Sequence, residues 1–133
     1  MTEAPSDSVH FDILVPSEVR AGETVPIALR VENRGADAAT LYLGGRTITF
    51  DVIVARDDGA VVWQRLKGAV VQSILQVRMV APGEVLELRT TWNQRGNDGS
   101  PVGAGSYQVR GELHTDQPSP MTTPTVALRV VER

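Results

Sequence analysis

The sequence predicts an all-β protein, namely an immunoglobulin-like antiparallel β-sandwich of about 7–9 strands. Three observations predict this fold. Apolar and polar residues alternate with a period of two in short runs, as they do in strands with one buried face. Residues that favour turns separate the runs. The runs follow one another at the short spacing that is typical of sandwiches and barrels.

The alternation is clearest in five runs, which begin at Val25, Ile48, Leu86, Tyr107 and Val126. In a strand every second side chain points the same way, so each run offers one apolar face and one wetter face. Across the chain we expect strands near residues 9–15, 25–33, 39–43, 47–56, 61–66, 73–80, 84–93, 105–114 and 122–132. A helical turn within residues 67–80 stays an alternative, because several apolar residues partly share a helical face there: Val70, Val71, Ile74, Leu75 and Val77.

Turn residues support these boundaries. Asp57-Asp58-Gly59 separates two apolar runs and predicts a hairpin turn. Ala81-Pro82-Gly83-Glu84 has Pro before Gly, the pairing that a type II turn favours. Pro118, Pro120 and Pro124 indicate an irregular connection into the last strand, since proline cannot donate to a central ladder.

Length and composition restrict the class of protein. The chain has 133 residues, which suits one domain, and we expect a flexible tail over residues 1–8 and a single domain over 9–133. With 13 Lys and Arg against 16 Asp and Glu, the net charge is −3, and the Arg residues are dispersed. A nucleic-acid surface needs clustered cations, so we expect no nucleic-acid partner.

The compartment is predicted from the N-terminus and from cysteine usage. The sequence has no cysteine, which excludes disulfides and thiolate chemistry. The first eight residues lack the basic start and apolar run of a signal peptide, and no stretch has the apolar length of a membrane span. We therefore expect no membrane insertion and a cytoplasmic protein, unless a leader was removed from the sequence.

The sequence offers no set of residues with the pattern of a catalytic, cofactor or metal site. His10 and Asp12, and likewise His114 and Asp116, share one strand face, but a catalytic zinc normally takes three protein ligands. Ser106 lacks the G-x-S-x-G setting of a nucleophile elbow. The stretch 44–47 lacks the spacing and the lysine of a phosphate loop. We expect no enzyme, no cofactor and no metal.

Two tryptophans leave a choice open. Trp63 and Trp92 could stack on a sugar, but each lies on an alternating run, which favours a buried or half-buried role. Asp57 and Asp58 lie in a turn, where solvated carboxylates are favoured over an acid–base pair.

The order of these features resembles the BsuPI family of intracellular proteinase inhibitors over roughly residues 9–131. The matching stretches are Gly22-Glu23, Val25-x-Ile27-x-Leu29-x-Val31-x-Asn33, Gly45-x-x-Ile48-x-Phe50-Asp51-Val52, Asp58-Gly59 with Val62-Trp63, Leu75 through Pro82-Gly83-Glu84, Trp92, and Gly105-x-Tyr107-x-Val109-x-Gly111. The resemblance implies a β-sandwich that inhibits serine proteases of the subtilisin type. The stretch 95–102 is longer than the family pattern leads one to expect, and a changed loop can mean a changed target.

An inhibitor of this kind presents an extended loop on a rigid scaffold. Two loops are candidates, Leu66–Ser73 and Asn93–Ala104, and the candidate protein-binding residues are Leu66, Lys67, Val70, Val71, Arg95, Asn97 and Asp98. Leu66, Val70, Val71 and Leu75 have the large apolar side chains that subtilisin-like enzymes tolerate at the cut site. We expect a monomer with a protein partner, a subtilisin-type serine protease. The alternative is a non-inhibitory immunoglobulin-like adhesion or assembly module of the cell envelope.

Overall fold

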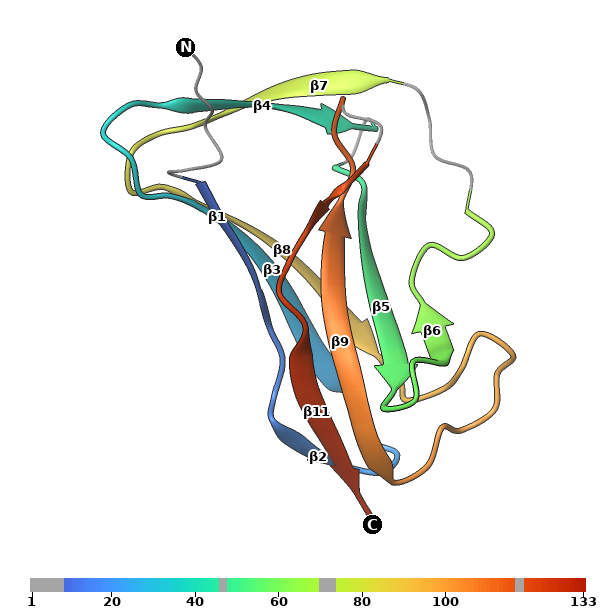
Figure 1. Ribbon diagram of the computed structural model, residues 1–133. Helices are drawn as coiled ribbons and strands as arrows, with labels where there is room; N and C mark the ends of the chain where they lie inside the picture. Colours follow the sequence, from blue (N-terminus) through green and yellow to red (C-terminus); the bar gives the residue numbers. More distant parts are fainter. Residues whose placement is uncertain (1–8, 46–47, 70–73, 117–118) are drawn as a thin grey trace.

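The computed structural model describes residues 9–45, 48–69, 74–116 and 119–133, and all regular elements in these ranges are β-strands. In chain order they are β1 (Val9–Leu14), β2 (Glu18–Arg20), β3 (Val25–Asn33), β4 (Ala39–Gly44), β5 (Phe50–Arg56), β6 (Val61–Gln64), β7 (Leu75–Val80), β8 (Val85–Trp92), β9 (Gly105–Leu113), β10 (Met121–Thr122) and β11 (Val126–Val131). Figure 1 shows their arrangement.

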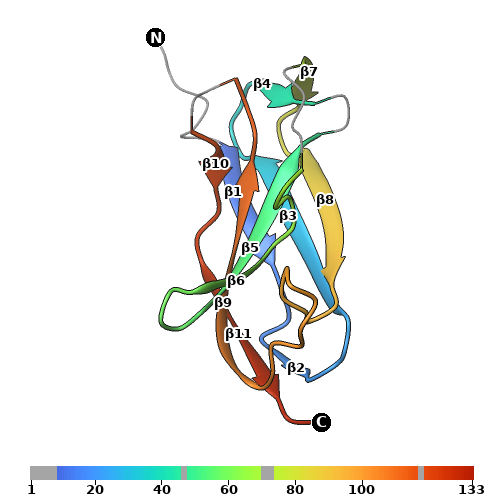
Figure 2. The ribbon, with the colours of Figure 1, turned by 90° about the vertical axis from the view of Figure 1, so that its right-hand side faces the viewer.

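Two sheets face each other, and a two-stranded ribbon closes one end of the molecule. One sheet has the order β1-β3-β8, and the other has the order β2-β11-β9-β5-β6 with β10 paired to β9. The ribbon pairs β4 with β7 and lies at the top of both Figure 1 and Figure 2. The predicted all-β, immunoglobulin-like antiparallel sandwich is confirmed.

The core lies between the two sheets and is built from the alternating positions that the sequence pattern marks. Strand β3 has a strictly alternating buried face, and its Leu29 is fully enclosed. Gly111 on β9 faces Leu29 so closely that a Cβ atom there would come within 2.8 Å of the leucine side chain. A larger residue at position 111 would therefore push the sheets apart.

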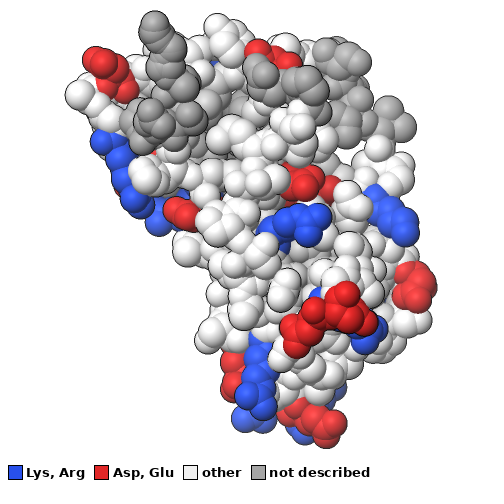
Figure 3. Space-filling model, in the orientation of Figure 1, with Lys and Arg blue, Asp and Glu red and all other residues white. Residues whose placement is uncertain are grey.

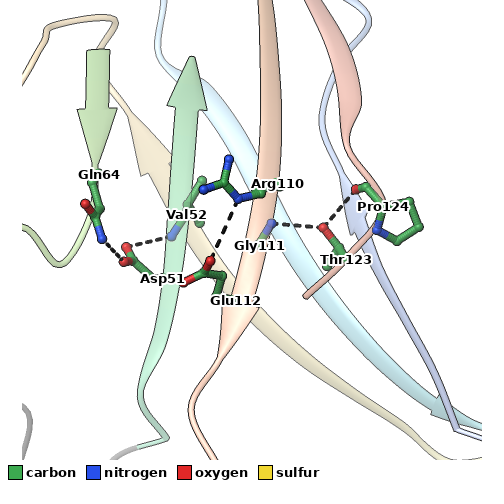
Figure 4. Close-up of polar contacts among 8 residues, drawn as sticks. All are labelled: Asp51, Val52, Gln64, Arg110, Gly111, Glu112, Thr123 and Pro124. Atoms are coloured by element: carbon green, nitrogen blue, oxygen red, sulfur yellow. Dashed lines mark hydrogen bonds and ion pairs between the residues drawn. The ribbon is translucent and has the colours of Figure 1, made fainter. Parts of the chain in front are cut away.

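The last predicted strand, 122–132, is two strands. Met121–Thr122 pairs with β9, and Val126–Val131 forms the longer strand β11. Between them Pro124 cannot donate to a ladder, and Thr123 fixes the break: its hydroxyl accepts a hydrogen bond from the Gly111 N–H at 2.9 Å and donates one to the Pro124 carbonyl (Figure 4). The irregular connection expected from the prolines is therefore found inside the predicted strand.

The structure also contains a strand that the sequence did not predict. Glu18–Arg20 forms β2, which pairs in parallel with β11. Three residues are too few to show a period of two, so the alternation could not reveal this strand.

The helical alternative for 67–80 is wrong for residues 75–80, which form β7. All six residues of β7 pair with β4, and this pairing decides the local structure. Leu75 and Val77 lie on that strand. Val70 and Val71 lie outside the described residues.

Strand β5 departs from the expected one-sided burial. Asp51 and Ile53 occupy the alternate, wetter positions of the run that begins at Ile48, yet both are buried, and so is Ala55. The reason is that β5 lies between β9 and β6, and the chain leaving β6 folds back across it. A charged residue is thereby enclosed in the middle of a central strand.

Tyr107, near the start of β9, ties this strand to the loop that precedes it. Its side chain is 2% exposed, and its hydroxyl lies 2.7 Å from the carbonyl oxygens of both Val102 and Gly103. A tyrosine that bonds back to the backbone a few residues upstream is the tyrosine corner of immunoglobulin-like sandwiches. The corner fixes where the loop 93–104 ends.

Replacing Tyr107 with Phe should lower the free energy of unfolding by about 1–2 kcal/mol at pH 7, because the hydroxyl bonds are lost. Burial raises the pKa of Tyr107, while nearby Arg56 lowers it in opposition. A pKa that is higher in the folded chain stabilises it fully below the unfolded value of about 10, and this contribution is lost as pH rises through the folded value. Urea unfolding of both proteins at neutral and at strongly alkaline pH should show the difference shrink above about pH 10. Equal stabilities at pH 7 would contradict the assigned bonds.

Candidate protein-binding site

Two segments far apart in the sequence lie side by side at the lower right of Figure 1. One is β6 with its exit turn, residues 65–69, and the other is the loop 93–104 between β8 and β9. These segments carry the candidate binding residues that the structure describes.

The loop 93–104 is closed by its own hydrogen bonds. The Gly96 N–H donates to the Ser100 carbonyl at 2.9 Å, and the Gly99 N–H donates to the Gly96 carbonyl at 2.9 Å. The Asp98 carboxylate accepts from the Ser100 N–H at 2.9 Å, and the Arg95 guanidinium donates to the Gly99 carbonyl at 2.7 Å. The loop is thus a short hairpin with an exposed tip at residues 97–100.

Gln94 anchors the base of this loop to the end of β2 and to the turn that follows β2. Its side chain is 3% exposed, and its amide N–H group donates to the carbonyls of Arg20 and Glu23 at 2.7 and 2.9 Å. Its backbone carbonyl accepts from the Val102 N–H at 3.0 Å. Its φ of 61° lies in the left-handed region, which non-glycine residues rarely adopt and which the surrounding bonds enforce here.

Asn97 fastens the tip of the loop to the outer edge of β6. Its backbone N–H donates to the Val62 carbonyl at 3.1 Å. Its side-chain amide pairs with the Gln64 backbone in both directions, accepting from the N–H at 2.8 Å and donating to the carbonyl at 3.0 Å. Gly96 permits this approach, since a Cβ atom there would meet the Val62 carbonyl at 3.1 Å. One asparagine therefore imitates a neighbouring strand and covers the edge of the sheet.

The buried carboxylate of Asp51 positions the exit turn of β6. One of its oxygens accepts from the backbone N–H groups of Val52 and Leu66, both at 2.9 Å, and the other accepts from the Gln64 amide at 2.7 Å. Figure 4 shows the bonds to Val52 and Gln64. Asp51 itself is 2% exposed. A carboxylate with three donors is a strong local restraint, so the turn is held against β5.

Arg65 adds a second restraint on the same turn. Its guanidinium donates to the Phe50 carbonyl at 2.7 Å and lies 4.0 Å from the centre of the Phe50 ring, a cation–π contact. Burial lowers the pKa of Arg65, and the Asp51 carboxylate raises it in opposition. The side chain remains charged at neutral pH.

The two segments enclose a hollow of about 550 Å³ that is lined by, among others, Arg56, Lys67, Asn97 and Asp98. The structure therefore brings Lys67, Asn97 and Asp98 together, as candidate residues from different loops. Leu66, which precedes Lys67, is half-buried, and Arg95 is exposed at the loop base. Val70 and Val71 lie outside the described residues, and Leu75 lies on β7 in the terminal ribbon.

Asp51 and Gln94 organise this site, and the sequence predicted a site role for neither, although Asp51 lies in a stretch that matches the BsuPI pattern. For Asp51 a signal existed, because a charged residue within the apolar run 48–54 requires partners if both faces are buried. For Gln94 no pattern could have revealed a left-handed backbone or bonds to residues more than 70 positions away.

The model of the family described as BsuPI, intracellular proteinase inhibitor, matches residues 13–118. The chain belongs to the BsuPI family. The family description names an inhibitor, so this BsuPI chain is proteinase-inhibitor-like. No curated protein sequence matches the chain.

Solved structures share the fold of this BsuPI chain at low sequence identity. The sporulation control protein Spo0M from Bacillus subtilis has a TM-score of 0.54 at 14% identity over 92% of this chain and 49% of its own. The β-glucosidase EmGH1 from Erythrobacter marinus has a TM-score of 0.51 at 13% identity over 93% of this chain and 15% of its own. The CARDB domain of the PF1109 protein from Pyrococcus furiosus has a TM-score of 0.47 at 15% identity over 92% of this chain and 87% of its own. The BsuPI chain thus spans about half of Spo0M and a small part of the glucosidase, and the first two likenesses support the fold alone.

The described part of the BsuPI chain holds no group of three His, Asp or Glu side chains placed to bind a metal ion. It also holds no helix with the length and apolarity of a membrane span. On the face shown in Figure 3, cationic and anionic side chains are interspersed and form no patch of one sign. Trp92 is 1% exposed and stacks on Trp63, which favours the core role over a sugar platform.

Proposed function

We propose that this BsuPI chain inhibits a cytoplasmic serine protease of the subtilisin type by inserting the tip of the loop 93–104 into the protease cleft, as a monomer. The observation that carries the proposal is the restraint on this loop. Hydrogen bonds close it internally and fix it at Gln94 and at Asn97. A loop that is ordered before binding loses little conformational freedom on association, which favours affinity.

The exit turn of β6 extends the proposed contact surface. Lys67 and Asp98 border the hollow from its two sides, and Arg95 is exposed nearby. Charged residues at the rim of an interface mainly raise the association rate and select the partner. We therefore assign the loop tip, which includes Asp98, to the cleft, and we assign Lys67 and Arg95 to the rim.

The test is a titration of a subtilisin-type protease with the purified chain, followed by hydrolysis of a chromogenic peptide. We expect activity to fall in proportion to added chain until one equivalent is reached. Full protease activity in the presence of about 10 μM chain would end the proposal for this protease class.

A variant separates the loop from the scaffold. Asn97→Ala removes the side-chain bonds to Gln64, so we expect inhibition to weaken about tenfold and the loop to be cleaved faster. Glu18→Ala is the matched control, because Glu18 is an exposed polar residue on β2, at the opposite edge of the same sheet. Equal inhibition by both variants would place the contact elsewhere.

A further inference from the structure

The terminal ribbon leaves one strand edge open, and the hydrogen bonds of β4 show which backbone groups lie on it. The Tyr42 carbonyl accepts from the Asp116 N–H at 3.1 Å, on the side of β4 away from β7. Tyr42 is directly opposite Val77. In an antiparallel pair, two opposite residues either exchange both backbone hydrogen bonds or direct their N–H and carbonyl groups away from each other. Because the Tyr42 carbonyl points away from β7, the N–H and carbonyl of Val77 point away from β4.

The same argument applies to the flanking residues of β7. The Gly44 N–H donates to the His114 carbonyl at 3.0 Å, and Gly44 is opposite Leu75. The direction of the backbone groups alternates along a strand, so the N–H and carbonyl of Met79 point outward like those of Leu75 and Val77. The outer edge of β7 thus presents three outward-pointing N–H and carbonyl pairs, and no strand among the described residues pairs with this edge.

The same three residues, Leu75, Val77 and Met79, also expose apolar side chains. Their exposed fractions are 51%, 62% and 56%, and Tyr42 beside them is 47% exposed. Two other strand edges are covered: Asn97 caps β6, and residues 114–116 bond to the outer side of β4. A row of unpaired backbone N–H and carbonyl groups is best satisfied by another extended strand, so the partner of this edge is a strand.

We propose that this occupant is a second copy of the chain, with β7 pairing antiparallel to β7 about a two-fold axis at Val77. The two ribbons would then form one four-stranded sheet that extends beyond the end of the sandwich shown in Figures 1 and 2. This inference goes beyond the proposed inhibition and does not depend on it.

The sequence of β7 complements itself under that symmetry. Val77 meets Val77 of the second copy, and Leu75 meets Met79, so apolar side chains form the cross-strand pairs on the exposed face. On the other face Arg78 meets Gln76, so no like charges are opposed, and Arg78 already pairs with Glu84 at 3.1 Å. An isologous interface requires this kind of self-complementarity.

The size of the contact sets its strength. A six-residue edge and its four exposed apolar side chains bury about 400 Å² per copy, half of the roughly 800 Å² of a standard stable interface. The dimer is therefore weak, with a dissociation constant on the order of 100 μM. The chain is a monomer at the lower concentrations of an inhibition assay.

Analytical ultracentrifugation over a concentration series, up to about 1 mM, tests the proposal. We expect reversible dimerisation of the full chain. Val77→Lys and Val77→Glu each place two like charges at the two-fold axis, so each should weaken dimerisation at least tenfold, to roughly 1 mM or beyond. An equimolar mixture of these two variants should dimerise again, as a heterodimer. Leu14→Lys, at a residue 50% exposed on β1, is the control and should dimerise like the unmodified chain.

Three results would overturn the proposal. They are an unmodified chain that stays monomeric at about 1 mM, single-charge variants that dimerise normally, or a mixture that forms no heterodimer. The first of these would leave the edge to a strand from a different protein. Circular dichroism of each variant verifies that the monomer remains folded.

Discussion

Replacing Trp92 with Ala should lower the free energy of unfolding by about 3–5 kcal/mol, as for other fully buried aromatic residues. Trp92 is 1% exposed at the end of β8. Its ring stacks on Trp63 at a centroid distance of 5.8 Å and meets the edge of Tyr107 at 6.2 Å. Its indole N–H also donates to the Arg95 carbonyl at 2.9 Å, so the substitution removes packing and a loop anchor together.

Urea unfolding, followed by circular dichroism, measures the effect. Trp92→Phe should retain most of the packing and lack only the hydrogen bond of the indole N–H. The decrease in its free energy of unfolding should therefore be clearly smaller than that of Trp92→Ala. Val61→Ala serves as the exposed control, because Val61 is 54% exposed and should change stability by less than about 0.5 kcal/mol. An unchanged urea midpoint for Trp92→Ala would mean that the ring is exposed, and this result would favour the sugar-stacking role of Trp92.

Periodicity predicted the fold because the sandwich buries alternate residues of each strand. In β3 and β9 the apolar residues of the sequence pattern are the core residues of the structure. The hairpin at 57–59 is confirmed as well: the Gly59 N–H donates to the Arg56 carbonyl, and Gly59 has a φ of 89°. Such local features follow from local sequence.

The features that periodicity missed depend on distant neighbours. Strand β5 is buried on both faces because β6 and its exit turn cover it. The alternation within residues 47–56 does not predict that second covered face. The same holds for the candidate site. Sequence analysis predicted its exposed residues, such as Lys67 and Asp98, but not the buried Asp51 and Gln94 that position them. The bonds of Gln94 reach residues more than 70 positions away and leave no local signal, whereas Asp51 bonds within 15 positions and leaves only the signal of a charge in an apolar run.

Replacing Asp51 with Ala should lower the free energy of unfolding by about 3 kcal/mol, the second large effect. The substitution removes the acceptor of three hydrogen bonds and leaves the Leu66 N–H and the Gln64 amide without their partner. Asp51→Asn should cost only about 1 kcal/mol, because its oxygen can still accept from the backbone while the Gln64 amide turns over to accept from the new N–H group. Asp57→Ala, in the exposed hairpin turn, is the matched control.

The same pair of variants separates stability from binding. Under conditions where both are folded, Asp51→Ala should also weaken the proposed inhibition, because the turn that carries Lys67 is no longer held against β5. Asp51→Asn should retain it, since the bond to the Leu66 N–H survives. Unfolding and protease titration of both proteins give the two readouts independently. If Asp51→Ala is destabilised but inhibits as well as the unmodified chain, the exit turn belongs to the scaffold alone, and the loop 93–104 carries the contact without it.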